Sequence, residues 1–249
     1  MANGSDIIDY RLVGDDMQAV IVTLDPGEQV LAEAGTMLYM HDGVEMQTTT
    51  AAAGGEHRGL FGRMLGAAGR ALAGESFFIT TFSNTGSARA DVAFSAPYPG
   101  KIVPMPLAEM GGTMLCQKDA FLAAARGTEI SVAFQKKIGA GLFGGEGFIL
   151  QKLQGDGLAF VHAGGSVFPL QLGPGQSLRV DTGCIVALQP SVSYDIQMVG
   201  GFKNALFGGE GLFFAHLCGP GVVYLQTLPF ARLADRIGAA TRGRGTGEG

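Results

Sequence analysis

Apolar residues along this chain fall in short runs that are bounded by glycine, proline and polar turn residues. The clearest runs lie at residues 20–24, 77–82, 148–153 and 212–217. Short runs rich in β-branched and aromatic residues, closed by turn signals, are typical of β-strands. The pattern therefore predicts an all-β chain.

The last three of these strands begin with apolar residues on both faces. Phe148 and Leu150, for example, point to one face while Ile149 points to the other, because side chains alternate along a strand. A strand that is apolar on both faces is buried on both sides. We expect the inner face to meet the core, and the outer face to meet another repeat, a loop or a subunit.

A glycine-rich motif precedes each of these three strands. The sequence Leu-Phe-Gly-Gly-Glu-Gly occurs at residues 142–147 and again at 206–211, and a split version has Leu-Phe-Gly at 60–62 and Gly-Glu-Ser at 74–76. Self-similarity over this length indicates one structural unit used three times. We place the units at about residues 18–98, 99–164 and 165–230.

Turn residues support the same division. Pro26-Gly27 leads to the sequence Gly-Thr-Met-Leu at 35–38, and Pro174-Gly175 leads with the same spacing to Gly-Cys-Ile-Val at 183–186. We match the Gly-Thr-Met-Leu of the middle unit, at 112–115, to these two segments. Proline presets φ and glycine accepts a positive φ, so each Pro-Gly pair predicts a type II turn.

Two further features refine the strand assignment. Prolines within the predicted strands at 102–107 and 167–172 place these strands at sheet edges or bulges, because proline cannot donate to the hydrogen-bond ladder. Residues 10–12 begin an additional N-terminal strand outside the three units.

One segment departs from the β pattern. Between Leu60 and Ala73 the apolar residues recur at helical spacing, with Arg63 and Arg70 on the other side, which predicts a short amphipathic helical insertion. The Gly- and Arg-rich sequence after Ile237 has no apolar periodicity. We therefore expect residues 233–249 to form a C-terminal arm or an irregular tail.

Together these patterns predict a single domain over residues 1–232. Its expected fold is three tandem β repeats with pseudo-threefold symmetry in a barrel or prism, with one short helical insertion. Glycine makes up 41 of 249 residues and charged residues only 16%, which suits short strands, tight turns and burial between subunits. We therefore also expect a homo-oligomer.

Charge and cysteine content exclude several classes of protein. The formal net charge of −5 argues against a general nucleic-acid or anionic-membrane surface. Cys116, Cys184 and Cys218 show no C-x-x-C spacing, which indicates reduced thiols rather than disulfides or a zinc site. No secretory signal and no stretch of about 18 apolar residues is visible, so we expect a cytoplasmic protein.

Glu75, Glu146 and Glu210 occupy the same position in the three copies of the motif and are the candidate binding residues. We favour a structural interpretation, in which each carboxylate accepts hydrogen bonds from glycine N–H groups in the turn. The alternative gathers the three carboxylates near a pseudo-threefold axis as a cation site or a coupled acid cluster, in which like charges raise at least one pKa.

Residues for other chemistry are not arranged in a recognisable pattern. The four histidines lack metal-ligand spacing, and no nucleophile motif is present. The Leu-Phe-Gly-Gly-Glu-Gly copies lack the lysine of a phosphate loop and precede strands rather than helices. We therefore expect no catalytic residues, no metal and no cofactor, and a protein that is not an enzyme.

The combination of these motifs resembles the altered-inheritance-of-mitochondria protein 24 family. The resemblance rests on Ala-Gly-Thr-Met at 34–37, the basic insertion that runs into Gly-Glu-Ser-Phe-Phe at 74–78, and the two later motif copies. It implies a threefold-repeated fold of the double-stranded β-helix class, similar to the tryptophan RNA-binding attenuation protein. It also implies a link, in mitochondrial members, to inner-membrane organisation. The resemblance provides no catalytic residues, and the similarity in fold does not by itself imply RNA binding.

Three functions remain as hypotheses. The leading one is a non-enzymatic scaffold or protein-interaction module. The alternative is a small-ligand-binding module with a pocket between repeats. A third is peripheral membrane or partner contact through residues 58–73, in which Arg63 and Arg70 face the anionic surface.

Overall fold

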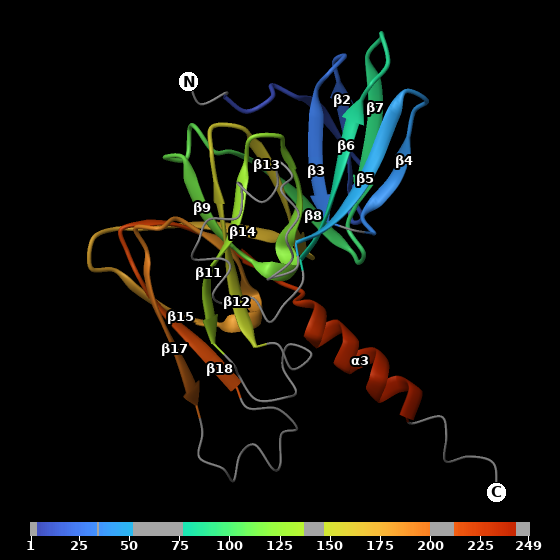
Figure 1. The fold of residues 1–249 in the computed structure, drawn as a ribbon. Helices are drawn as coiled ribbons and strands as arrows, with labels where there is room; N and C mark the ends of the chain where they lie inside the picture. Colours follow the sequence, from blue (N-terminus) through green and yellow to red (C-terminus); the bar gives the residue numbers. More distant parts are fainter. Residues whose placement is uncertain (1–3, 34, 52–76, 137–146, 200–211, 243–249) are drawn as a thin grey trace, which may run out of the picture.

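The chain is almost entirely β-structure in the computed structural model, which describes residues 4–33, 35–51, 77–136, 147–199 and 212–242. Within these residues the strands form four antiparallel sheets, here named A to D, and the last described segment is a single α-helix (Figure 1). The all-β prediction is confirmed.

The strands of each sheet are given in the order in which they pair. Sheet A contains β1 (Asp9–Val13), β2 (Ala19–Leu24), β7 (Ala90–Ser95) and β4 (Met37–Met40). Sheet B contains β5 (Val44–Ala51), β6 (Phe77–Asn84), β3 (Gln29–Glu33), β10 (Phe121–Ala125), β13 (Leu158–Gly164) and β8 (Gly100–Pro106). Sheet C contains β11 (Glu129–Lys136), β12 (Phe148–Gln154), β9 (Thr113–Gln117), β16 (Ile185–Leu188), β19 (Gly221–Gln226) and β14 (Val167–Leu172). Sheet D contains β15 (Ser177–Asp181), β18 (Leu212–Cys218) and β17 (Ser193–Val199).

Three apolar clusters lie between successive sheets. The first joins Val22 and Phe94 of sheet A to Phe82 and Phe160 of sheet B. The second lies between sheets B and C, and the third between sheets C and D; their largest members are Met105, Phe121, Met114, Leu153, Phe148, Leu150, Ile196 and Leu217. The sheets therefore stack in the order A, B, C, D, and sheets B and C contribute to a core on both faces.

This stacking corrects the expected barrel. The described strands of each sheet end at two unpaired edges, so they form a stack of open sheets and do not close on themselves. Phe148, Ile149 and Leu150 of β12 are all buried, as predicted for a strand that is apolar on both faces. Their sheet is covered on both sides by neighbouring sheets, which removes the need for closure around an axis.

Local predictions agree with the structure where they rest on proline and glycine. The proline-containing strands β8 and β14 lie at the edges of sheets B and C. Gly27 has a φ of 90° and Gly175 a φ of 75°, the positive values that the Pro-Gly turns require. Strand β1 is the predicted additional N-terminal strand.

The sequence match of the middle unit was wrong. Gly111 and Gly112 form a turn in which both have positive φ. The residues after this turn form β9, which pairs with β12 as β3 pairs with β6. Strand β9 is therefore the counterpart of β3, and not of β4. The segment that leads into β10, through the 3-10 turn η1 (Lys118–Ala120), holds the position of Thr36 and Met37. The sequence Gly-Thr-Met-Leu occurs in both units, but it leads into β4 in the first unit and into β9 in the second.

The C-terminal segment, for which an arm or an irregular tail was expected, is helical as far as Arg242. Helix α3 (Phe230–Arg242) begins directly after Pro229, and Phe230, Leu233 and Ile237 recur on it at helical spacing. In Figure 1 it extends away from the sheets. The predicted helical insertion between Leu60 and Ala73 lies outside the described residues.

The side chain of Asn84 joins the end of β2 to the hairpin between β6 and β7. It is 1% exposed, its Nδ2 donates to the carbonyls of Leu24 at 2.9 Å and Ala88 at 2.8 Å, and its Oδ1 accepts from the Gly86 N–H at 3.0 Å. We expect Asn84→Ala to lower the free energy of unfolding by about 2–3 kcal/mol, because it leaves buried backbone groups without partners. Urea denaturation measures this change.

The exposed Ser87, in the same hairpin, provides the control. Ser87→Ala should leave the midpoint of the urea transition unchanged. Equal midpoints for the Asn84→Ala variant and the wild type would show that these hydrogen bonds do not stabilise the fold.

Candidate functional site

Strand β4 is one of several edge strands with exposed apolar side chains, as are β1, with Tyr10, Leu12 and Val13, and β14, with Phe168 and Leu170. Met37 and Met40 are each 38% exposed and Leu38 is 57% exposed. Among the described residues β4 pairs only with β7, so its other edge offers unpaired N–H and C=O groups. An exposed apolar edge of this kind is a template for pairing with another strand.

The strands that hold the same place in sheets B and C are fully buried. β10 pairs with β13 and β16 pairs with β19, as β4 pairs with β7, and each pairing has a register shift after its first residue pair. β10 and β16 have a second partner, respectively β3 and β9. Every residue of β10 and of β16 is buried, so the exposure of β4 follows from the absence of a second partner in the described chain.

The opposite outer sheet has an equivalent free edge. Strand β15 pairs only with β18 among the described strands, whereas β3 and β9 each have two neighbours. Ser177 and Arg179 of β15 are exposed and Val180 is buried. Each outer sheet of the stack therefore ends in a strand whose counterpart in the inner sheets is paired on both sides.

A second candidate site is a partly buried group of titratable residues beside η1. Burial, together with the negative charge of Asp119, raises the pKa of Glu33 from 4.5 to about 7, while Lys118 opposes the shift. Burial, with the charges of Asp119 and Glu33, raises the pKa of Tyr98 to about 12. These side chains come from β3, from the turn before β8 and from η1, so the group forms only in the folded chain.

His162 of β13 extends this group. It is 2% exposed, and its ring lies 4.5 Å from that of Tyr98 in an edge-to-face contact. Neither ring nitrogen has a hydrogen-bond partner among the described residues. Burial lowers the pKa of His162 from 6.5 to about 4, with a small opposing effect from the backbone of Tyr98.

This group does not form a metal centre with the side chains that the structure describes. No set of three or more potential ligands that could hold a metal occurs among the described residues. Cys116 is fully buried, and burial raises its thiol pKa to about 12, so this thiol stays protonated and unreactive near neutral pH. The three cysteines are free, as the sequence predicted.

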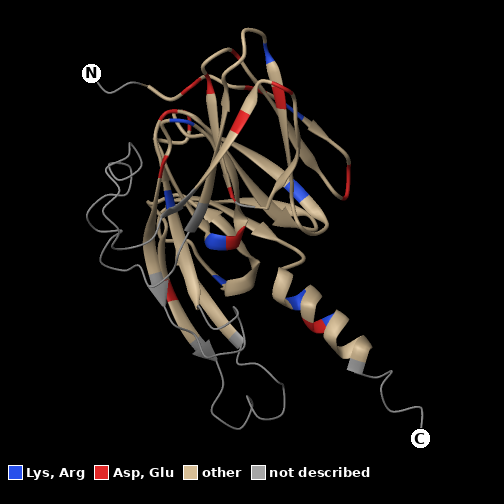
Figure 2. Ribbon diagram, turned by 45° about the vertical axis from the view of Figure 1, so that its right-hand side comes forward, with Lys and Arg blue, Asp and Glu red and all other residues tan. Residues whose placement is uncertain are grey.

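The structure does not place the residues that the sequence put forward as binding candidates. Glu75, Glu146 and Glu210, together with Arg63 and Arg70, lie outside the described residues. The structure indicates the exposed residues of β4 as candidates instead. The sequence analysis included Met37 and Leu38 in the Gly-Thr-Met-Leu segment, but nothing in the sequence pattern predicted that they are exposed. Charged positions are spread over strands, turns and α3 (Figure 2).

Comparisons with known proteins agree on the family and the fold. A family model described as mitochondrial biogenesis AIM24 matches residues 10–228. An uncharacterised protein of Streptococcus pyogenes serotype M6 is 30% identical over 240 residues, which cover 94% of this chain and 92% of that protein. A crystal structure of a Streptococcus pyogenes protein matches with a TM-score of 0.71 at 24% identity, over 95% of this chain and 99% of that one. At this identity the match speaks for the fold alone.

No helix in the part of the chain that the structure describes is long and apolar enough to cross a membrane.

The raised pKa of Glu33 predicts a pH-dependent stability. Between about pH 4.5 and 7 the folded chain holds a proton on Glu33 that the unfolded chain releases, so this group lowers stability as the pH rises through that window. Relative to wild type, Glu33→Gln should therefore gain on the order of 3 kcal/mol between pH 4.5 and 8. Urea denaturation at a series of pH values measures it, and a constant difference would contradict the burial of the charged form.

His162 acts in the opposite direction. Its pKa is lowered to about 4, so the unfolded chain binds more protons between pH 6.5 and 4, and stability falls as the pH falls. His162→Phe keeps an aromatic ring against Tyr98 and should flatten this acid limb in the same denaturation series. An acid limb as steep as in wild type would show that His162 does not resist protonation.

Proposed function

We propose that this chain, which belongs to the mitochondrial biogenesis AIM24 family, is a non-enzymatic scaffold that assembles through the free edge of β4. The observation that carries the proposal is the exposure of Met37, Leu38 and Met40 at a position that is buried and doubly paired in sheets B and C. The homo-oligomer expected from the composition is the simplest form of such a scaffold.

We also propose that the chain consists of three tandem repeats of one structural unit, which follow one another along the stack of sheets and are not closed around a threefold axis. The support is that each unit contributes two groups of three paired strands, which we call half-sheets, and that the strands follow the same order in every unit. The pairs of half-sheets are β5-β6-β3 with β4-β7-β2, then β11-β12-β9 with β10-β13-β8, and finally β17-β18-β15 with β16-β19-β14. These strands run over residues 19–95, 100–164 and 167–226, within the unit boundaries that the sequence predicted.

The energetic case for assembly rests on apolar area and unpaired backbone groups together. Burying a Met or Leu side chain completely stabilises a complex by roughly 1.5–3 kcal/mol, and these side chains are already partly covered. Three of them alone would give only weak association. A stable interface buries about 800 Å² on each partner, so the contact must extend from the edge of β4 to neighbouring surfaces such as Met46 of β5, which is 49% exposed.

The other hypotheses have less support. The possibility of a small ligand rests on the unpartnered ring nitrogens of His162, for which the described residues offer no recognisable ligand chemistry. Membrane contact through residues 58–73 rests on the sequence alone.

A charge on β4 tests the proposal. We expect Leu38→Glu to weaken self-association by about 10- to 100-fold, because the exposed apolar side chain becomes a carboxylate that the interface would have to desolvate. Sedimentation velocity over a range of concentrations measures this change, and circular dichroism checks that the variant is folded.

The control is Ile237→Glu on α3, where the wild-type side chain is also 57% exposed. It introduces the same charge and should sediment as the wild type does. A wild-type chain that remains monomeric at every concentration, or two variants that behave alike, would refute assembly through β4.

A further inference from the structure

We infer that the strand that pairs with β4 is β15 of a second copy of this chain. The contact is head-to-tail: sheet D of one copy joins sheet A of the next copy into one continuous antiparallel sheet. This inference rests on the proposed scaffold function and adds the identity of the partner surface and its register.

The inner sheets show how a complete sheet is built. Sheet B joins the half-sheet β5-β6-β3 to the half-sheet β10-β13-β8 through the pairing of β3 with β10. Sheet C joins β11-β12-β9 to β16-β19-β14 through the pairing of β9 with β16. The chain therefore makes the same type of junction twice, each time between antiparallel strands.

The outer sheets are the two halves that remain. Sheet D consists of β17, β18 and β15, with β15 at the edge where β3 and β9 make their junctions. Sheet A ends in β4, at the edge where β10 and β16 make theirs, and carries β1 on its far side. Each outer sheet thus lacks the half-sheet that the other one supplies.

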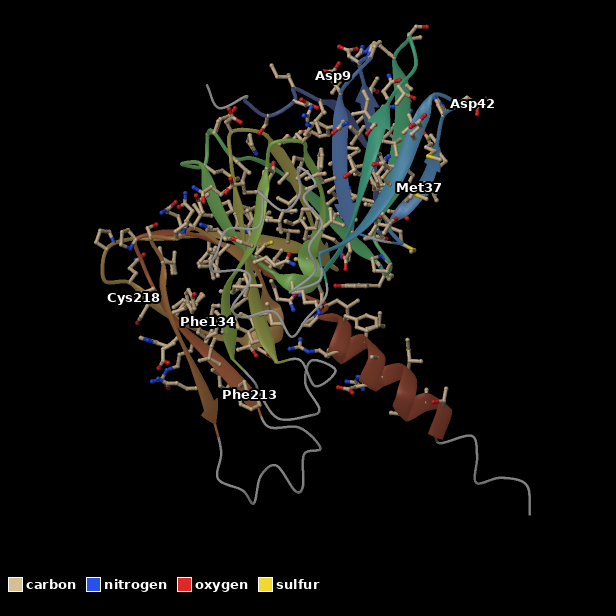
Figure 3. The ribbon with its side chains drawn as sticks, in the orientation of Figure 1. Asp9, Met37, Asp42, Phe134, Phe213 and Cys218 are labelled. Carbon is tan, nitrogen blue, oxygen red and sulfur yellow. The ribbon has the colours of Figure 1, made fainter. Side chains whose placement is uncertain are left out.

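The two free edges cannot meet within one chain. Sheets A and D are the outer layers of the stack, and packed sheets lie about 10 Å apart, which separates A from D by roughly 30 Å. In Figure 3, Met37 on β4 lies at one end of the molecule, and Cys218 and Phe213 on β18, the neighbour of β15, lie at the other end. The missing junction therefore requires a second copy.

The inner junctions also fix the register. Ala124 pairs with Leu31 in sheet B, and Leu188 pairs with Leu115 in sheet C. In sheet A the equivalent of Ala124 is Met40, because Met40 pairs with Val92 as Ala124 pairs with Ala159. In sheet D the equivalent of Leu31 is Arg179, because Arg179 pairs with His216 as Leu31 pairs with Thr81. Met40 of one copy should therefore lie opposite Arg179 of the next.

The adjacent pair follows from the same junctions. Ala123 lies opposite Ala32, and Ala187 lies opposite Cys116. Their equivalents are Tyr39 on β4 and Val180 on β15. The side chains at the free edges differ in one respect from those of the inner junctions, since Arg179 stands where the inner strands have leucine. A charged residue suits a contact between copies better than a core, and it disfavours pairing with unrelated strands.

Head-to-tail contacts of this kind use two different surfaces, so each copy can bind one neighbour at each end. The joined sheet would lie between sheet C of one copy and sheet B of the next, and so continue the stacking order of the chain. It would cover the exposed residues of β4 in the way that β10 and β16 are covered.

Cysteine pairing tests the inference in the full-length chain. We would place Met40→Cys and Arg179→Cys in separate chains, each carrying Cys184→Ser and Cys218→Ser to remove the two partly exposed native thiols. Directly opposed residues on antiparallel strands have Cα atoms about 4.5–5.5 Å apart, within the range that a disulfide spans. We expect a covalent dimer after mild oxidation only when the two variants are mixed, and its loss on reduction.

Three results would overturn or relocate the inference. A dimer from the Met40→Cys chain alone would mean that β4 pairs with β4, so the scaffold would stand and the role of β15 would fall. The same conclusion follows if the wild type assembles through Leu38 but the mixed variants form no disulfide. If the wild type never associates, the proposed function fails together with the inference.

A complementation experiment serves if the cysteine variants fold poorly. Leu38→Glu blocks the β4 edge, and Arg179→Pro removes a backbone donor from the free edge of β15, because the neighbouring Gln176 carbonyl accepts from Gly219 and alternate residues of β15 therefore face β18. Each variant alone should remain monomeric, whereas a mixture should form a one-to-one complex from the remaining intact edges. Mixed chains that stay monomeric, while the wild type associates, would contradict the head-to-tail contact.

Discussion

The pairing of backbone groups at strand edges is the constraint on which this structure depends. Every strand needs hydrogen-bond partners for its N–H and C=O groups, and a stack of sheets also needs apolar side chains on both faces of its inner layers. Sheets B and C meet both requirements at their centres, where β3 pairs with β10 and β9 pairs with β16. Sheets A and D meet them only in part, because each is one half-sheet of the same design. The free edges of β4 and β15 are the consequence.

The packing of the sheets buries titratable groups beside η1, and this burial destabilises their charged forms. Glu33 and His162 lie on strands that two different cores cover, and burial shifts their pKa values in opposite directions, to about 7 and about 4. Glu33 favours the folded state at low pH and His162 favours it at high pH. Their effects on stability therefore offset one another in the window between the two shifted values.

The sequence predicted the features that local chemistry determines. Pro104 and Pro169 marked edge strands because proline has no N–H to donate, and Gly27 and Gly175 marked turns because their φ is positive. The stack of open sheets was not predictable in this way, because the pairing of β3 with β10 joins residues far apart in the sequence. The exposure of Leu38 was hidden for the same reason: its strand has the composition of a buried one, and only the absence of a second neighbour exposes it. Glu33 and His162 both approach Tyr98 only after sheet B has formed.

Hydrogen exchange of the backbone amides shows whether β4 and β15 are two halves of one junction. It can be followed segment by segment at low and high protein concentration. We predict that amides of residues 37–40 and 177–181 become protected together as the concentration rises, while those of β14 at the edge of sheet C do not change. Protection of residues 37–40 without residues 177–181, or protection of neither segment, would contradict it.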